Sequence, residues 1–428
     1  MAEWRNWAGD QRCTPAEIVR PRDEGEVAAA VARARERGLK VRAAGAGHSF
    51  QDVVLTDGML LDLGALDRVV DHDPDSGVVR VQGGVRLHAL GPQLAARGLA
   101  LENQGDIDAQ ALAGALMTGT HGTGERFRNL SANVVGMRIV DGRGELRELT
   151  DPDELRAARV SLGAVGVVTE IALRCVPLFG LRRVDEPEPL GPTLDRLDEL
   201  VAGHDHLELF VFPYTDKALV RRSWRLGPDL DPSPRWRARL QEDVLENTVL
   251  GAACRAGRRW PSRIPAINRG LVAASSRTEK RDVAFRVYAN RRSVRFTEME
   301  YALPRAAGRE AVERVLGIVA ERRLPVGFPI EVRFVAGDDA FLSPAGGRDT
   351  CYLAFHQFQG MDWREPFAAV EEILDGLGGR PHWGKRHSQT AATLAPRYPQ
   401  WEAFQAVRER LDPDRVFTSP AIERVLGP

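Results

Sequence analysis

The sequence predicts an α+β protein of two domains, the second of which is a cap domain built on an antiparallel sheet. The first part of the 428-residue chain opens with a β-α-β pattern and continues with short strands, which favours an α+β domain over a doubly wound sheet. Four later runs alternate between apolar and polar residues and indicate antiparallel strands with helical runs between them. These runs are LELFVFPY (207–214), VRFTEMEYALP (294–304), PIEVRFV (329–335) and CYLAFHQF (351–358).

The first helix is predicted to begin after Asp23, because Glu26 follows three residues later as in a capping box. Apolar residues recur at helical spacing from Val27 to Ala34, and Gly38 ends the helix. The rest of the first domain is predicted to contain strands at 39–43, 59–63, 68–72 and 78–82, helices at 87–97 and 109–119, a hairpin around 142–144 and a closing strand within 161–178.

A domain boundary is predicted near residue 179, where the polar, proline-containing stretch RRVDEPEPLGPT (182–193) reads as a linker. The second part carries helical runs at 308–322 and 364–376 between its strands, and YPQWEAFQAVRERLDPDRVF near the carboxy end reads as a helix followed by a turn. We therefore expect a first domain at 1–178, a cap or substrate domain at 179–385 and a carboxy-terminal segment at 386–428.

The composition bounds the possible functions. The formal net charge of −1 argues against a general nucleic-acid surface, which needs clustered positive charge. The polar amino terminus shows no secretory signal, and no apolar run is long enough for a membrane span, so a cytoplasmic location is expected. Four widely spaced cysteines form no C-x-x-C pair and read as reduced thiols: Cys13, Cys175, Cys254 and Cys351.

The stretch RAAGAGHSF (42–50) is the first candidate site. Gly45 and Gly47 permit backbone angles that let N–H groups converge on an anion, so a phosphate or pyrophosphate is expected over this loop. Phe50 stands where the dinucleotide fingerprint G-x-G-x-x-G has its third glycine, which disfavours a nicotinamide cofactor. A loop that only holds phosphate has no need of His48, which is either a hydrogen-bonding residue or a reactive one.

Three motifs, in order along the chain, resemble those of one family. RAAGAGHSF resembles the glycine-rich loop of flavoproteins in the vanillyl-alcohol oxidase (VAO) superfamily. GDIDAQALAGALMTGTHGTG (105–124) resembles the second flavin loop of aldonolactone oxidases, and RPHWGKRH (380–387) resembles their H-W-x-K motif. Over nearly its whole length the chain is similar to the sugar-lactone oxidoreductases of this superfamily, above all actinobacterial L-gulono-1,4-lactone dehydrogenases and D-arabinono-1,4-lactone oxidases.

The resemblance implies a VAO/PCMH-type FAD-binding domain, a cap over the flavin ring and a carboxy-terminal segment that returns to the FAD domain. It also implies FAD as the cofactor, joined covalently through the 8-methyl group to His48, which would retain the cofactor and raise its potential. The cofactor-binding residues that it implies are Ala43, Ala44, Gly45, Ala46, Gly47, His48, Ser49, Gly105, Gly114, Thr118, Gly119, His121, Gly122, Thr123 and Val168.

Glu331 and Arg333 lie two residues apart on a predicted strand, so their side chains point to the same face. Such a pair is either an ordinary surface ion pair or, in an otherwise apolar strand, a buried pair that serves a function. The resemblance places both in the substrate pocket as catalytic and substrate-binding residues. Glu331 would accept hydrogen bonds from substrate hydroxyls, and Arg333 would place positive charge beside the reacting carbon.

His356 lies on an alternating strand, where it either faces the same pocket as a substrate-binding residue or is a core histidine. The resemblance places Lys385 at the pyrimidine edge of the flavin as a catalytic and substrate-binding residue. His382 and His387 have no third ligand at a matching spacing, so no metal is expected.

Gly105 and Asp106 mark a departure from the aldonolactone oxidases, which often carry serine or alanine just after this glycine. Asp106 matches a serine that touches substrate in alditol oxidases, so a substrate-binding role is implied for it, and the difference favours a lactone over an alditol. Gly105 would lie near the flavin, where a side chain gates oxygen.

The function expected from this resemblance is FAD-dependent oxidation of an aldono-1,4-lactone, with L-gulono-1,4-lactone as the leading substrate and D-arabinono-1,4-lactone beside it. A C–H hydrogen beside a hydroxyl would leave as hydride to the flavin, while Lys385 and Arg333 stabilise negative charge. The product would be ascorbate or an analogue. The alternatives are an alditol oxidase acting on xylitol or sorbitol and a non-catalytic flavin protein that transfers electrons. The electron acceptor is left open among oxygen, a quinone and a cytochrome.

Overall fold

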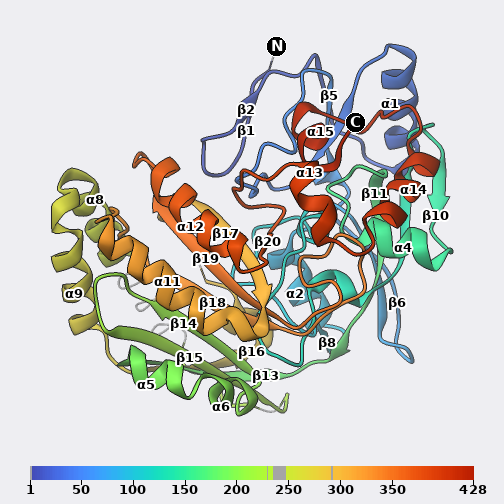
Figure 1. The fold of residues 1–428 in the computed structure, drawn as a ribbon. Coiled ribbons are helices and arrows are strands. Elements are labelled where there is room, and N and C mark those ends of the chain that lie inside the picture. Colours follow the sequence, from blue (N-terminus) through green and yellow to red (C-terminus); the bar gives the residue numbers. More distant parts are fainter. Residues whose placement is uncertain (1, 229, 235–246, 291–292) are drawn as a thin grey trace.

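The computed structural model describes residues 2–228, 230–234, 247–290 and 293–428. Figure 1 shows two lobes: the amino-terminal part of the chain and its last helices form one, and the middle of the chain forms the other. Among the described helices, none is both long and apolar enough to cross a bilayer.

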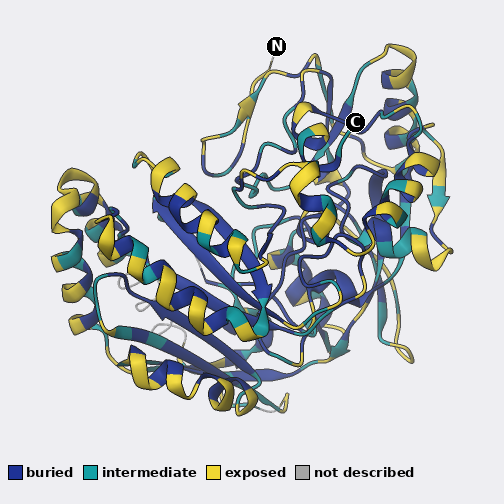
Figure 2. Ribbon diagram, in the orientation of Figure 1, coloured by how far each residue is buried: buried dark blue, intermediate teal, exposed yellow. Residues whose placement is uncertain are grey.

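A small parallel sheet carries the glycine-rich loop. Strand β4 (Val41–Ala44) and strand β3 (Glu17–Val19) flank strand β5 (Met59–Asp62). Helix α1 (Glu24–Glu36) connects the outer strands and buries its apolar residues against this sheet (Figure 2). Asp23 caps the helix by accepting a hydrogen bond from the Glu26 N–H at 2.8 Å, which confirms the predicted start.

A second, antiparallel sheet of the first lobe has the order β10-β9-β11-β7-β6. Its strands are β6 (Val69–Asp73), β7 (Val78–Gln82), β9 (Val134–Val140), β10 (Leu146–Glu148) and β11 (Val167–Arg174), and β9 and β10 form the predicted hairpin. Helix α2 (Leu87–Ala95) lies within the helix predicted at 87–97. Helix α3 (Leu112–Met117) is shorter than the predicted 109–119, because Ala111 is extended and bridges Arg86.

The cap is an eight-stranded sheet in which every pair of neighbours is antiparallel, as predicted. Its order is β16-β13-β15-β14-β18-β19-β17-β20. In chain order the strands are β13 (Gly180–Pro189), β14 (His206–Val211), β15 (Lys217–Leu226), β16 (Thr278–Val283), β17 (Phe296–Pro304), β18 (Ile330–Val335), β19 (Thr350–Phe358) and β20 (Arg380–Pro381).

The linker predicted at 182–193 is wrong, since most of it belongs to β13 in the interior of the sheet. Arg183 and Asp185 lie in the part of β13 that pairs on both sides. Pro187 and Pro189 lie beyond the part that pairs with β16, where the missing N–H groups leave no neighbour unsatisfied. The prolines are therefore compatible with β13, because its last residues pair with β15 on one side and with no strand on the other.

The two faces of the cap sheet differ in chemistry. One face packs apolar side chains such as Val332, Phe334 and Leu353 against helices α11 (Gly308–Glu321) and α12 (Arg364–Gly376). The opposite face carries charged side chains, and the register aligns residues of neighbouring strands along it. Figure 1 shows the helices on the outer side of the sheet. The charged face therefore turns toward the first lobe.

The carboxy-terminal segment lies against the first lobe. It contains α13 (Ala391–Leu394), α14 (Trp401–Leu411) and α15 (Pro420–Leu426). The Val41 N–H of β4 donates to the Val416 carbonyl at 2.8 Å. The buried Arg42 guanidinium donates to the carbonyl of Phe417 at 2.8 Å and also to that of Leu162. The last residues thus support the strand from which the glycine-rich loop begins.

Candidate active site

The glycine-rich loop forms one wall of a groove of about 960 Å³ in the first lobe. Glycine is required at several points of this wall. A Cβ on Gly45 would lie 2.8 Å from the Ala111 Cβ, and one on Gly84 would lie 1.9 Å from the Leu63 carbonyl oxygen. Gly47 has a φ of +67°. Side chains are thus kept out, and a ligand in the groove meets bare backbone.

The amides of this loop fit a pyrophosphate. Within the described chain, the backbone N–H groups of residues 46–49 have no hydrogen-bond acceptor. Consecutive N–H groups left unpaired around a glycine of positive φ form an anion-binding concavity. The groove can therefore hold the pyrophosphate of FAD, with small side chains along the rest of its length.

The structure brings two thirds of the predicted cofactor residues together. Those that line the groove are Ala43, Ala44, Gly45, Ala46, Gly47, His48, Ser49, Gly114, Thr118 and Val168. Gly105, Gly119, His121, Gly122 and Thr123 lie outside it. The groove has further lining residues that were not predicted from the sequence, among them Gly83, Gly84, Gly163 and Gly166. The glycine pair directly after strand β7 was the available signal.

His48 lies where the groove meets a second cavity of about 990 Å³. Trp7 stacks on its imidazole with ring centroids 5.4 Å apart and planes at 24°. Burial, together with the positive charges of Arg86 and Lys385, lowers the pKa of His48 to about 4. The imidazole is therefore neutral at pH 7, the protonation state of a nucleophile.

Lys385 lines this second cavity and forms an ion pair with Glu298 of β17. Burial acts to lower the pKa of Lys385, but the carboxylates of Glu298 and Glu300 outweigh it and raise that pKa above its ordinary value. A fixed ammonium group therefore faces the cavity. Phe50 and Phe296 supply apolar walls.

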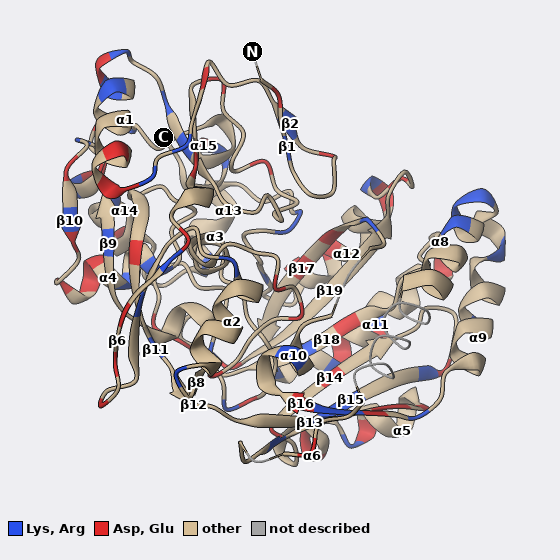
Figure 3. Ribbon diagram, turned by 180° about the vertical axis from the view of Figure 1, so that it is seen from behind, with Lys and Arg blue, Asp and Glu red and all other residues tan. Residues whose placement is uncertain are grey.

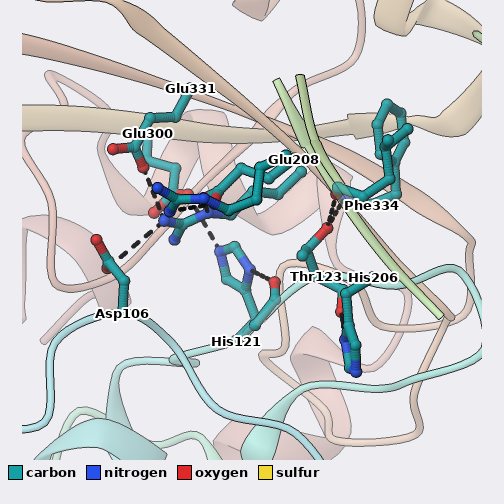
Figure 4. A network of polar contacts seen from close by, with 12 residues as sticks. Asp106, His121, Thr123, His206, Glu208, Glu300, Glu331 and Phe334 are labelled. Carbon is teal, nitrogen blue, oxygen red and sulfur yellow. Dashed lines mark hydrogen bonds and ion pairs between the residues drawn. The ribbon is translucent and has the colours of Figure 1, made fainter. Parts of the chain in front are cut away.

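Arg333 on the charged face of the cap sheet is held by three carboxylates, Glu208 and Glu331 of the same sheet and Asp106 of the first lobe, which Figure 4 shows close together. Its Nη2 lies 2.8 Å from Glu331 and 3.5 Å from Asp106, and its Nε donates to Glu208. Burial acts to lower the pKa of Arg333, yet Glu208, Glu331 and Asp106 raise it far above its usual value. Glu331 and Arg333 of β18 are thus a buried pair, and the ion pair of Arg333 with Asp106 connects them to the motif at 105–124.

A smaller polar cavity of about 430 Å³ adjoins this cluster and is lined by Gly105, Asp106, Glu208 and Arg333 among others. Gly122 and Thr123 of the predicted cofactor set also line it. Gly105 faces backbone: a Cβ there would lie 3.0 Å from the His121 carbonyl oxygen. The middle of the motif at 105–124, helix α3, therefore lines the groove, and the two ends of the motif line the smaller cavity together with residues of the cap.

His121 forms a buried polar contact with Glu300. Its Nε2 lies 3.1 Å from Glu300 Oε1, and its Nδ1 donates to the Gly122 carbonyl at 2.8 Å. Burial acts to raise the pKa of Glu300, but His121 outweighs it and lowers that pKa, so the carboxylate is ionised. Both ring nitrogens of His121 therefore face oxygen atoms, which fixes the ring between the Gly122 carbonyl and Glu300.

His121, Glu300 and His382 place ligand atoms within 4.8 Å of one another. His382 Nδ1 already accepts a hydrogen bond from the Gly384 N–H at 3.0 Å, and His121 is occupied as described. The cluster is therefore accounted for by hydrogen bonds. His387, the other histidine of the motif, packs on the Trp383 ring.

His356 is buried between Phe296 and Phe328, and its Nε2 lies 3.5 Å from Glu298 Oε1. It touches the ion pair of Lys385 through this shared carboxylate and does not line the described cavities. Glu208, Glu298 and Glu300 were missed from the sequence. Their signal was the one used for Glu331, namely a carboxylate on a buried, alternating strand.

Comparison with known proteins agrees with this architecture. The D-arabinono-1,4-lactone oxidase family profile matches residues 171–425, and the FAD binding domain profile matches residues 15–150. The chain is 55% identical over 425 residues to L-gulono-1,4-lactone dehydrogenase of Mycobacterium tuberculosis, covering 99% of each chain. It is 33% identical over 432 residues to alditol oxidase of a Streptomyces species, covering 98% of each.

Among solved structures, cholesterol oxidase from Brevibacterium sterolicum superposes with a TM-score of 0.80 over 99% of this chain and 96% of its own, at 17% identity. This likeness confirms the predicted VAO/PCMH-type fold, and the FAD binding domain match confirms FAD as the cofactor. A groove with free amides, cavities with fixed cations and a match over most of the chain lead to one assignment: the protein is a flavin-dependent oxidoreductase and belongs to the D-arabinono-1,4-lactone oxidase family.

Proposed function

We propose that this enzyme oxidises an aldono-1,4-lactone at a CH–OH group, with L-gulono-1,4-lactone as the leading substrate and D-arabinono-1,4-lactone as the second. The product would be ascorbate or an analogue of it. The observation that carries the proposal is the pair of fixed cations, Lys385 and Arg333, each held by carboxylates of the cap sheet beside the FAD-binding lobe. The 55% identity to an L-gulono-1,4-lactone dehydrogenase supports the choice of lactone.

FAD, when bound in the groove, supplies the acceptor for the hydride that leaves the substrate carbon. The residues of the chain position the substrate and stabilise charge. Glu331 and Asp106 accept hydrogen bonds from substrate hydroxyls, while Arg333 holds these carboxylates in place and adds positive charge. Lys385 places its ammonium in the cavity of about 990 Å³, hereafter the larger cavity. There it stabilises negative charge as the reaction proceeds.

His356 acts through Glu298, since its Nε2 approaches the carboxylate that also holds Lys385. We propose that it fixes the position of this carboxylate and so of the ammonium group. The cavity walls of Phe50 and Phe296 exclude water around them.

An alditol oxidase is the second candidate, because a 33% identical relative of full length carries that activity. Anaerobic bleaching of the yellow flavin absorption separates the two. Bleaching by L-gulono-1,4-lactone and not by xylitol is the expected result, and bleaching by xylitol alone would overturn the lactone assignment. If neither compound bleached a bound flavin, the proposed substrate class would be refuted. The family assignment would be unaffected, because it rests on the sequence matches.

We further propose that FAD is bonded to His48. The neutral, partly buried imidazole between the groove and the second cavity supports this, as does its stacking on Trp7. Acid precipitation should leave the yellow colour in the protein pellet, and His48→Ala should release it to the supernatant. Colour in the supernatant of the unaltered protein would refute the bond.

The electron acceptor is proposed to be oxygen, a quinone or a cytochrome, and readmitting each to the bleached enzyme identifies which one restores the colour. We also propose residues 1–178 as the FAD-binding domain, 179–385 as the cap and 386–428 as a segment that completes the FAD-binding domain. The hydrogen bonds of Val416 and Phe417 to β4 support the last assignment. A cytoplasmic location remains a prediction, to be checked by cell fractionation.

A further inference from the structure

The cap carries a basic surface at its outer end whose arginines have no carboxylate partner among the described residues. Helices α8 (Leu250–Arg259) and α9 (Ile264–Ala274) form a helical hairpin there. Residues 250–274 contain five arginines and no aspartate or glutamate, although the whole chain is nearly neutral. Figure 3 shows the end of α8 in blue. We name the exposed residues of the turn the basic tip: Arg255, Arg258, Arg259, Trp260 and Arg263.

The arginines of the basic tip have no carboxylate partner among the described residues. Arg258 donates only to the Gln359 carbonyl, at 3.2 Å. Other exposed arginines of the cap are paired within their own helix: on α11, Arg309 bonds Glu313 at 2.9 Å and Arg314 bonds Glu310 at 3.1 Å. Single exposed arginines without a described carboxylate partner also occur elsewhere, such as Arg196 and Arg322, but the basic tip gathers four of them around one turn.

Trp260 adds an apolar anchor among these charges. It is 56% exposed, the most of any large apolar side chain in the described part of the chain, and Val249 at the start of the hairpin is 39% exposed. Folding gains nothing from an indole left in water. A tryptophan among clustered arginines on an amphipathic helical element is typical of segments that lie at an anionic bilayer surface.

Helix α8, which carries part of the basic tip, packs against the wall of the candidate active site through its first half. Cys254 and Leu250 of α8 pack in one apolar cluster with Trp7, Phe50 and Phe296. These three aromatic residues line the larger cavity that holds Lys385. A surface seated on the hairpin would therefore lie beside a wall of the cavity.

From the charge, the exposed indole and this position, we infer that the basic tip docks the enzyme on the surface of an anionic lipid bilayer. Arginine side chains would face the lipid phosphates, and Trp260 would enter the headgroup region. The docking is peripheral and reversible, since it relies on one indole and a few charges.

Sedimentation with vesicles tests the inference on the flavin-loaded protein. Vesicles of phosphatidylcholine mixed with phosphatidylglycerol should carry the protein down at low salt, and pure phosphatidylcholine vesicles should not. High salt should release most of it, because screening shortens the reach of surface charges. Equal binding to both kinds of vesicle, or to neither, would overturn the inference.

Variants locate the surface. Arg259→Glu combined with Arg263→Glu should weaken vesicle binding by at least about 25-fold, since each basic residue contributes about fivefold. The matched control is Arg128→Glu with Arg174→Glu, the same change of charge at two exposed positions of the first lobe. Trp260→Ser should remove the binding that survives high salt. An equal loss in the control pair, or unchanged binding in Trp260→Ser, would refute the role of the basic tip.

Discussion

The imidazole of His121 lies nearly parallel to the phenol ring of Tyr352, with ring centroids 3.6 Å apart and planes at 19°. This contact fixes the plane of the imidazole, so that its two nitrogens point at the Gly122 carbonyl and at Glu300. The second flavin-loop motif is thereby tied to the cap sheet by one imidazole ring. The pair is a link between the lobes as well as a local polar contact.

Glu300→Gln should lower the free energy of unfolding by about 1–3 kcal/mol, because it removes the carboxylate that faces the buried His121 Nε2 at 3.1 Å. Urea unfolding at pH 7 measures the change. The matched control is Glu310→Gln on the surface of α11, whose pair with Arg314 is exposed and should contribute less than about 1 kcal/mol. Equal effects at the two positions would contradict the proposed link.

Lys385→Met should leave FAD bound while slowing anaerobic bleaching by about 10²-fold or more, the usual loss when one fixed charge-stabilising group is removed. The control is Lys217→Met, a partly exposed lysine of β15 that lies away from the larger cavity. Stopped-flow absorbance gives the rate of bleaching for each variant. Bleaching within twofold of the unaltered enzyme would show that the ammonium group plays no part in the reaction.

Arg333→Met should destabilise the fold by about 3–5 kcal/mol, because three carboxylates would lose the cation that they share. Arg333→Lys should restore much of this stability, since it keeps the charge. It should still react slowly, because an ammonium cannot hold Asp106, Glu208 and Glu331 in the same geometry. Thermal unfolding and bleaching measured together test both parts. Full activity in Arg333→Lys would count against a positioning role.

The buried His206 makes stability depend on pH. Its Nδ1 donates to the Thr123 carbonyl at 2.7 Å, and burial lowers its pKa to about 4. The unfolded chain binds this proton near pH 6.5, so between pH 6.5 and 4 only the unfolded state is protonated. The free energy of unfolding should therefore fall by up to roughly 3 kcal/mol as the pH drops through that window.

His206→Asn keeps a donor for the Thr123 carbonyl but cannot be protonated, so its stability should fall less between pH 6.5 and 4. Urea unfolding at several pH values gives the slopes. The control is His88→Asn, at an exposed histidine of α2, which should leave the slope as it is. A slope unchanged in His206→Asn would show that other groups set the acid sensitivity.

The sequence predicted the parts of the fold whose signal is local. Asp23 and Glu26 marked the start of α1, and alternation in 329–335 and 351–358 marked two cap strands. Strand β13 was missed because its prolines and charges suggest a linker, while its pairing with β15 and β16 depends on residues far along the chain. Tertiary pairing outweighed local propensity there.

The candidate site shows the same division. Glu331 and Arg333 were predicted to share a face, and the structure places them 2.8 Å apart. Glu208, which holds the same arginine, comes from a strand more than a hundred residues earlier, and only the sheet register brings it opposite Arg333. The roles proposed for these residues remain predictions, as do the domain boundaries at 178 and 385.

The hydrogen bonds from β4 to Val416 and Phe417 set an order on biosynthesis. The strand that leads into the glycine-rich loop emerges from the ribosome long before the residues that support it, since Arg42 and Phe417 are 375 residues apart. Arg42 can reach the Phe417 carbonyl only after that residue has been translated. FAD should therefore be taken up only after residue 417 has emerged, and a nascent chain that ends before Val416 should remain colourless.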